Sequence, residues 1–201
     1  TLAALAAHSD ASPASIGGGV ARGALLRHLF SVASLLACDA RDELLTAQLR
    51  LALLIIERVL EGHASAPLLL SVDLGGGLPL WNFSSVHLYE TTLASPQPLL
   101  AGAYTFLSYL LTQNLRRATF HPPLYLQALT LLHRLLVAQQ RAGQTLPLLR
   151  WPLVWDALFI TADFIAQDDV FSGRGVPEVG LRVLELINVL VTLGDQILPN
   201  A

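Results

Sequence analysis

The chain has no lysine, no methionine and only one cysteine, Cys38. A single cysteine excludes a disulfide within the chain, so we expect a reducing, cytoplasmic setting. The basic residues are all arginine, and they are scattered singly except for Arg116 and Arg117. A protein that binds nucleic acid needs a basic patch or stripe. The scatter, together with a formal net charge of −3, predicts no nucleic-acid partner.

Charged residues are also scarce, at 13% of the chain, whereas hydrophobic residues make up 53%. Such a composition is typical either of a membrane protein or of helices that are covered on several sides. The best candidate for a membrane span is the uncharged segment 91–115. Pro96, Pro98 and several amides leave roughly sixteen mostly apolar residues in it, fewer than the ~20 that a span needs. We therefore expect a buried helix there.

Two long apolar segments with a helical period occupy residues 150–200. In the first, an inward face is formed by Trp151, Val154, Trp155, Leu158, Ala162 and Ile165. In the second, the stripe consists of Val183, Leu186, Ile187, Leu190 and Val191, widened by Leu184 and Leu193. The short polar turn at 168–176 predicts that the two helices run antiparallel.

Four more helices are expected at residues 21–37, 42–61, 97–117 and 122–141. Asp39 or Asp42 can cap the second of these, Pro122 suits the first turn of the fourth, and Gly143 suits its end. The helices thus form hairpins over 21–61, 97–141 and 150–200. This pattern predicts an all-α fold of stacked antiparallel helical hairpins, an armadillo/HEAT-like α-solenoid segment without a fixed sequence period.

The domain organisation follows from where glycine and proline gather. Residues 1–20 contain SPASIGGG and are expected to form a linker or a disordered segment. Residues 21–200 are expected to form a single armadillo-like helical domain, with an irregular insertion at about 62–96. Weak alternation over 81–89 allows one short strand or hairpin arm in that insertion.

No pattern in the sequence indicates catalysis, a metal or a cofactor. The glycine clusters at 17–19 and 75–77 lack the Lys-Ser/Thr of a phosphate-binding loop, and the histidines never occur with metal-ligand spacing. His133 is expected to be a hydrogen-bonded packing residue, and the pair Asp168 and Asp169 to be solvated. We therefore expect a protein that is not an enzyme.

The candidate partner-binding residues are Trp151 and Trp155, which lie four positions apart and so share a helix face. Exposed tryptophans are frequent anchors in protein interfaces. Packing into the core is the alternative role for both side chains.

The segment VLELINVLVTLGDQILPN, preceded by RWPLVWDALFITADFIAQDD, resembles the C-terminal region of the armadillo-like helical domain-containing protein 3 family. The positions that carry this resemblance are Trp155, Gly194, Asp195, Leu198 and Pro199. The resemblance implies a cytosolic, Golgi-associated scaffold that binds phosphatidylinositol 4-kinase beta and helps recruit a Golgi Arf exchange factor. It supplies no catalytic residues and no kinase-binding residues to carry across.

Two functions therefore stand as hypotheses. The first is a non-enzymatic helical-repeat adaptor, which docks a partner helix or loop on a surface with a few aromatic or arginine anchors. The alternative is a membrane- or lipid-binding helical domain that uses the uncharged segment 91–115 as a peripheral anchor.

Overall fold

The computed structural model describes residues 13–38, 42–61, 65–70, 79–83, 88–92, 98–113, 115, 120–143, 145–146 and 151–197. Its elements, in chain order, are α1 (Pro13–Ala37), α2 (Glu43–Leu60), α3 (Ser65–Leu70), β1 (Pro79–Phe83), β2 (Leu88–Thr92), α5 (Leu99–Gln113), α6 (Pro122–Ala142), α7 (Trp151–Ile165), α8 (Asp168–Phe171) and α9 (Val176–Ile197).

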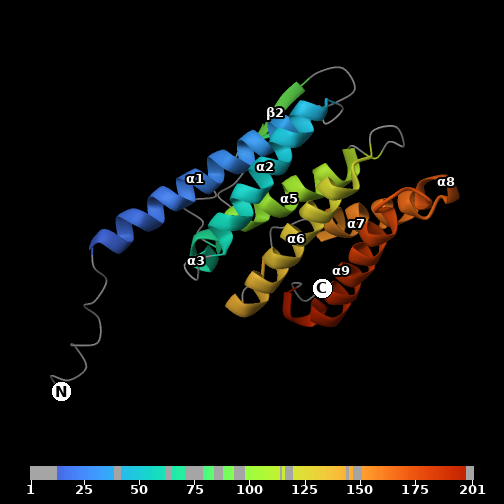
Figure 1. Cartoon of the computed structure of the whole chain (residues 1–201). Helices are drawn as coiled ribbons and strands as arrows, with labels where there is room; N and C mark the ends of the chain where they lie inside the picture. The colour runs from blue at the N-terminus through green and yellow to red at the C-terminus, as the bar shows by residue number, and fades with distance from the viewer. Residues whose placement is uncertain are drawn as a thin grey trace.

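The long helices form stacked hairpins in two layers (Figure 1). Helix α1 pairs with α2, α5 with α6, and α7 with α9. Across the hairpins, α5 packs on α1 and α7 in one layer, and α6 packs on α2 and α9 in the other. In Figure 1, α1 and α5 run in one direction and α2 and α6 in the opposite one. This is the repeating geometry of an α-solenoid, so the predicted fold class is confirmed.

The ends of the long helices follow the signals in the sequence. Asp42 caps α2, where its Oδ1 accepts the backbone N–H of Leu44 at 2.7 Å. Helix α6 begins at Pro122, whose missing N–H costs nothing in a first turn. It ends at Gly143, which adopts the left-handed conformation with a φ of 60°.

Helix α5 lies in the centre of the array and has α1, α3, α6 and α7 as neighbours. Its buried residues are Leu99, Leu100, Ala101, Gly102, Ala103, Tyr104, Phe106, Leu107, Ser108, Leu110 and Leu111. The expectation of a buried helix in this part of 91–115 is therefore correct. The alternative function, lipid binding through 91–115, stays a prediction, although in the described part of this segment neighbouring helices cover α5 and residues 91–92 belong to β2.

Three boundaries differ from those expected. Helix α1 begins at Pro13 and not at residue 21, so residues 13–20 are helical and not a linker. Each glycine of the triplet at 17–19 costs about 1 kcal/mol against alanine, which an established helix can absorb as it extends. Helix α5 ends at Gln113 and not at residue 117. The turn at 168–176 contains the short helix α8, which two aspartates begin.

The insertion at 62–96 is less irregular than expected, since its described parts hold α3 and an antiparallel β-hairpin. In the hairpin, Pro79 pairs with Thr92 and Phe83 with Leu88. The buried Leu80 fixes β1 to the core, where the strand contacts α1 and α5. The weak alternation over 81–89 thus corresponds to a complete hairpin and not to one arm.

Candidate partner-binding surface

The two candidate tryptophans both lie on α7, but their side chains have different surroundings. Trp151 is only 6% exposed, and its ring centroid lies 5.7 Å from that of Tyr104 on α5. It therefore packs in the core. Trp155, one turn later, is half-buried and stacks on Phe159, with centroids 5.7 Å apart and ring planes 18° apart. Of the two, only Trp155 lies where a partner can reach it.

The outward side of α7 is apolar beyond Trp155. Phe159 is 55% exposed and Ile160 is 49% exposed. Asp156 and Asp163 are exposed on the same side, and α7 itself contains no basic residue. The surface of this helix therefore combines aromatic and aliphatic groups with negative charge.

Helix α9 packs on α7 and carries exposed apolar residues of its own. Its buried stripe consists of Val176, Val179, Val183, Leu186 and Leu190. Gly180 faces α7, because a Cβ placed on it would lie 3.4 Å from Cγ2 of Ile165. On its outward side, Leu181 and Leu184 are each 61% exposed and Val191 is 69% exposed. We call the exposed apolar residues of both helices the C-terminal face: Trp155, Phe159, Ile160, Leu181, Leu184 and Val191.

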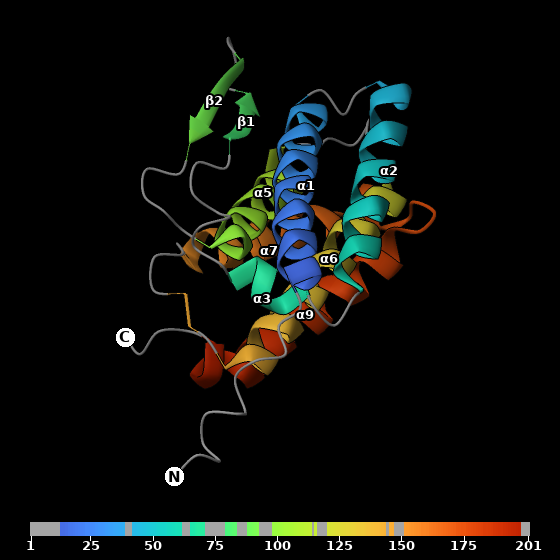
Figure 2. The same cartoon turned by 90° about the vertical axis from the view of Figure 1, so that its left-hand side faces the viewer.

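The hairpin α1/α2 forms the other end of the array and is seen in front of the remaining helices in Figure 2. It also carries large apolar side chains that point away from the central hairpin. We call this set the N-terminal face: Leu25, Val32, Leu35, Leu44, Leu51, Leu54 and Ile55.

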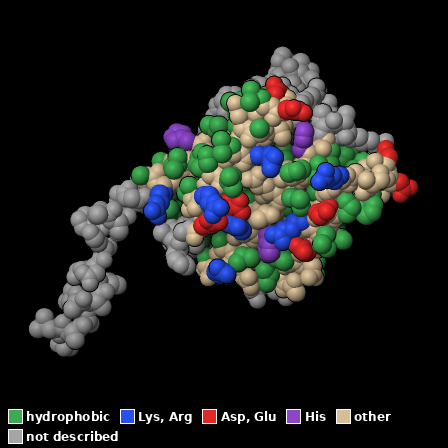
Figure 3. Space-filling view, in the orientation of Figure 1, with side chains coloured by type: hydrophobic (Ala, Val, Ile, Leu, Met, Phe, Trp, Pro, Cys, Tyr) green, Lys and Arg blue, Asp and Glu red, His purple; other side chains and the backbone are tan. Residues whose placement is uncertain are grey.

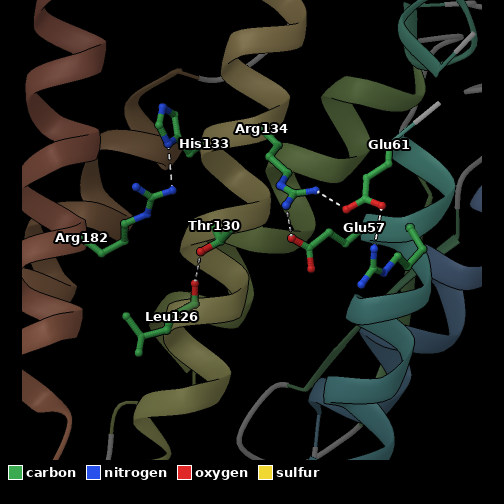
Figure 4. A network of polar contacts seen from close by, with 8 residues as sticks. Glu57, Glu61, Leu126, Thr130, His133, Arg134 and Arg182 are labelled. Atoms are coloured by element: carbon green, nitrogen blue, oxygen red, sulfur yellow. Dashed lines mark hydrogen bonds and ion pairs between the residues drawn. The ribbon is translucent and has the colours of Figure 1, made fainter. Parts of the chain in front are cut away.

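Polar contacts join the central helix α6 to its neighbours α2 and α9 (Figure 4). Arg134 lies 2.9 Å from Oε1 of Glu57 and 3.1 Å from Oε1 of Glu61, which also pairs with Arg58 at 2.9 Å. Hydrogen bonds from Arg134 and Arg58 lower the pKa of the Glu61 carboxyl. In Figure 3, basic and acidic side chains lie near one another across the middle of the view.

His133 is hydrogen-bonded, as the sequence predicts. Its Nδ1 accepts a hydrogen bond from Nη2 of Arg182 at 2.8 Å, and Nη1 of Arg182 pairs with Glu185 at 2.7 Å. A guanidinium can only donate, so this contact requires a neutral imidazole with its proton on Nε2. Burial, and then the Arg182 charge, lower the pKa of His133.

The described residues show little that could perform chemistry. Within them, no cluster of three or more His, Cys, Asp or Glu side chains could hold a metal ion. A shallow pocket of about 220 Å³ lies beside α8 and includes Asp169 and Arg174, and another of about 220 Å³ lies between Arg50 and His121. The Cys38 thiol donates to the Ser34 carbonyl at 3.3 Å, and burial raises its pKa, which disfavours the reactive thiolate.

Sequence periodicity missed part of the C-terminal face. It assigned Leu184 and Val191 to the inward stripe, whereas both are exposed. It did not single out Phe159 or Ile160. The sequence did contain a signal for these two residues, because α7 is apolar on both sides. A helix that is covered on one side only needs apolar residues on that side alone.

Two layers of antiparallel helical hairpins define the class of helical-repeat proteins of the armadillo-like kind. No curated protein and no solved structure matches the chain. Residues 98–201, however, match the family model of armadillo-like helical domain-containing protein 3, C-terminal. This match covers more than half of the chain and includes α5 to α9, so the chain belongs to that family. Of the positions that suggested the resemblance, Leu198 and Pro199 lie outside the described residues.

No helix in the described part of the chain combines the length and the hydrophobicity that crossing a membrane requires.

Proposed function

We propose that this chain is a non-enzymatic scaffold, a segment of a helical array that binds a protein partner. Its membership of the armadillo-like family carries the proposal, because stacked hairpins present extended surfaces that such proteins use for binding. The exposed apolar side chains on α1/α2 and on α7/α9 support it, since exposed apolar patches on a folded domain mark interaction sites.

The partner we propose is phosphatidylinositol 4-kinase beta, and the place of action is the cytoplasmic side of the Golgi. A Golgi Arf exchange factor is the second protein expected in the same assembly. This assignment rests on the family resemblance carried by Trp155, Gly194 and Asp195. In such an assembly the scaffold reaches the membrane through its partners and serves Golgi maintenance and secretion.

A direct binding experiment tests the proposal. The purified chain is mixed with purified phosphatidylinositol 4-kinase beta at micromolar concentrations and analysed by size-exclusion chromatography. We expect the two proteins to elute together, ahead of either alone. A type II phosphatidylinositol 4-kinase serves as the control and is expected to elute separately. Separate elution of the beta kinase at micromolar concentrations would remove it as the partner.

Vesicle flotation tests whether the chain needs that partner to reach a membrane. The purified chain is floated with vesicles of Golgi-like lipid composition, with and without the kinase. We expect flotation only with the kinase, because α5, the helix of the uncharged segment 91–115, is covered by α1, α6 and α7. Strong flotation of the chain alone would favour the lipid-binding function over the scaffold.

A further inference from the structure

We propose that the C-terminal face binds an amphipathic helix whose polar side is basic. This inference rests on the proposed scaffold function and names both the surface and the chemistry of the segment that docks there. The occupant lies along α7 and α9, on the side opposite to the one that α5 and α6 cover.

The apolar residues of the face have a spacing that suits the docking of a helix. Phe159 and Trp155 stack on each other one turn apart, so two aromatic rings form one apolar cluster. On α9, Leu181, Leu184 and Val191 recur at spacings of three and seven, which places them in one row. Amphipathic helices bind such surfaces through apolar residues at i, i+3, i+4 and i+7.

The charge around the face selects a basic partner. Residues 151–197 carry seven carboxylates and two arginines. One of those arginines, Arg182, is already bonded to Glu185 and His133. Asp156, Asp163 and Glu178 are exposed, and they form no ion pair with any residue that the structure describes. Complementary charge steers partners and disfavours those of like sign.

The opposite end of the array lacks this charge, although it is equally apolar. Residues 13–61 carry five arginines and five carboxylates, so their formal charge is zero. The basic specificity is therefore expected at the C-terminal face alone. This difference supplies an internal control within one chain.

The test uses synthetic peptides of about 18 residues, which form about five helical turns. The first peptide is amphipathic, with leucine on one side and arginine on the other. The second keeps the leucine positions but replaces each arginine by glutamate. The third has the composition of the first in a scrambled order, which keeps the charge and destroys the apolar side. Binding of fluorescein-labelled peptides to the full chain is measured by fluorescence anisotropy.

We expect the first peptide to bind at least about tenfold more tightly than either control, with an affinity that falls as salt rises. Equal binding of the first and the scrambled peptides would overturn the proposal, because attraction to net charge alone would then explain it. Equal binding of the first and the glutamate peptides would overturn the basic specificity. Failure of the first peptide to bind would overturn the proposal as well.

Matched variants locate the site. Phe159→Ser combined with Leu184→Ser is expected to weaken the first peptide by at least about tenfold. Leu51→Ser combined with Ile55→Ser changes two exposed side chains on the N-terminal face and is expected to leave its affinity unchanged. Loss of binding in the second pair but not in the first would overturn the assignment. Far-ultraviolet circular dichroism and melting curves establish that each variant is folded.

Charge variants provide a second measurement that does not alter the apolar residues. Asp156→Asn combined with Asp163→Asn is expected to reduce affinity several-fold and to flatten its dependence on salt. An unchanged affinity and an unchanged salt dependence would contradict the role given to these carboxylates.

The other occupant that could cover the C-terminal face is a second copy of the chain. Light scattering over a range of concentrations is expected to show a monomer whose mass does not change with Phe159→Ser. A dimer that Phe159→Ser dissociates would show that the face is covered by a copy, against the proposal. The kinase experiment is independent of these results: if the kinase binds the Phe159→Ser, Leu184→Ser variant as it binds the original chain, the scaffold function stands and only this surface is wrong.

Discussion

Helices α5 and α7 are each fifteen residues long, and each is largely apolar, yet they are buried to very different extents. Eleven residues of α5 are buried, against seven of α7. Within its layer, α5 lies between α1 and α7, whereas α7 has one described neighbour in that layer, α5, and packs otherwise on α8 and α9. Burial in this molecule is thus decided by the place of a helix in the array more than by its composition.

The same comparison applies to the contacts between hairpins. The central hairpin is joined to α2 through Arg134 and its two glutamates, and to α9 through His133 and Arg182. A hydrogen bond from Nε2 of Gln127 to the backbone carbonyl of Arg50, at 3.0 Å, adds to the first of these contacts. Each end hairpin therefore makes these polar contacts on the side that faces the central hairpin. Four pairs of substitutions, each with a matched control, test how far the central and end hairpins differ.

The largest effect is expected from removing a ring in the centre. Phe106 on α5 is fully buried and meets Phe30 edge-on, with centroids 6.0 Å apart. Phe106→Ala should lower the free energy of unfolding by about 3–5 kcal/mol, since a cavity remains in a packed core. Phe159→Ala makes the same chemical change on the exposed side of α7 and should cost less than about 1 kcal/mol. Urea denaturation of both variants measures the two values, and equal losses would contradict the assigned burial.

A smaller effect is expected from the buried polar contact between α5 and α6. The Tyr104 hydroxyl donates to Oε1 of Gln139 at 2.8 Å, and both side chains are buried. Tyr104→Phe should lower the free energy of unfolding by about 1–2 kcal/mol, because a buried acceptor loses its donor. Tyr109→Phe, at a half-buried position of the same helix, is the matched control and should change it by less than about 0.5 kcal/mol. An unchanged free energy of unfolding in Tyr104→Phe would show that this contact does not stabilise the central hairpin.

The ion pairs between α2 and α6 should contribute less. Arg134→Gln removes both contacts with the glutamates and is expected to cost up to about 1 kcal/mol, a loss that high salt reduces. Arg141→Gln alters an exposed arginine of α6 that forms no ion pair among the described residues, and it should be neutral. Unfolding curves at low and high salt distinguish the two. A cost that does not depend on salt would contradict an electrostatic origin.

The smallest effect is expected from the titration of His133 between α6 and α9. Its pKa lies below the ordinary 6.5 in the folded chain, owing to burial and to Arg182, which outweigh the opposing effect of Glu185. The unfolded chain therefore binds this proton more readily, and His133 makes stability fall as the pH drops from about 6.5 towards the folded pKa. In His133→Gln this part of the pH dependence should disappear. His28→Gln, at an exposed position on α1, should leave it unchanged; a pH profile identical in His133→Gln and the original chain would contradict the assignment.

Much of the fold could be predicted because the signals that define it are local. Asp42, Pro122 and Gly143 act within one turn of their own position, so the helix ends they mark agree with the structure. Helix α8 was not predicted, since its single turn is too short to show a period. The start of α1 was misplaced because the glycine triplet weakens a helix without preventing it from continuing.

The candidate site could be predicted only in part. The spacing of Trp151 and Trp155 drew attention to α7, but spacing alone could not tell which ring is covered by Tyr104 and which stacks on Phe159. The family resemblance near the C-terminus did identify the family, whose match extends through the central hairpin as well.

The sequence by itself determined the long helices, their pairing into antiparallel hairpins and the family, because periodicity, capping and turn length depend on neighbours along the chain. Only the tertiary structure decided which apolar residues are covered. Leu184 and Leu186 differ little as side chains, but Leu186 is buried and Leu184 is exposed. The reason is physical: burial depends on whether another helix lies opposite a side chain, and that helix comes from a distant part of the sequence.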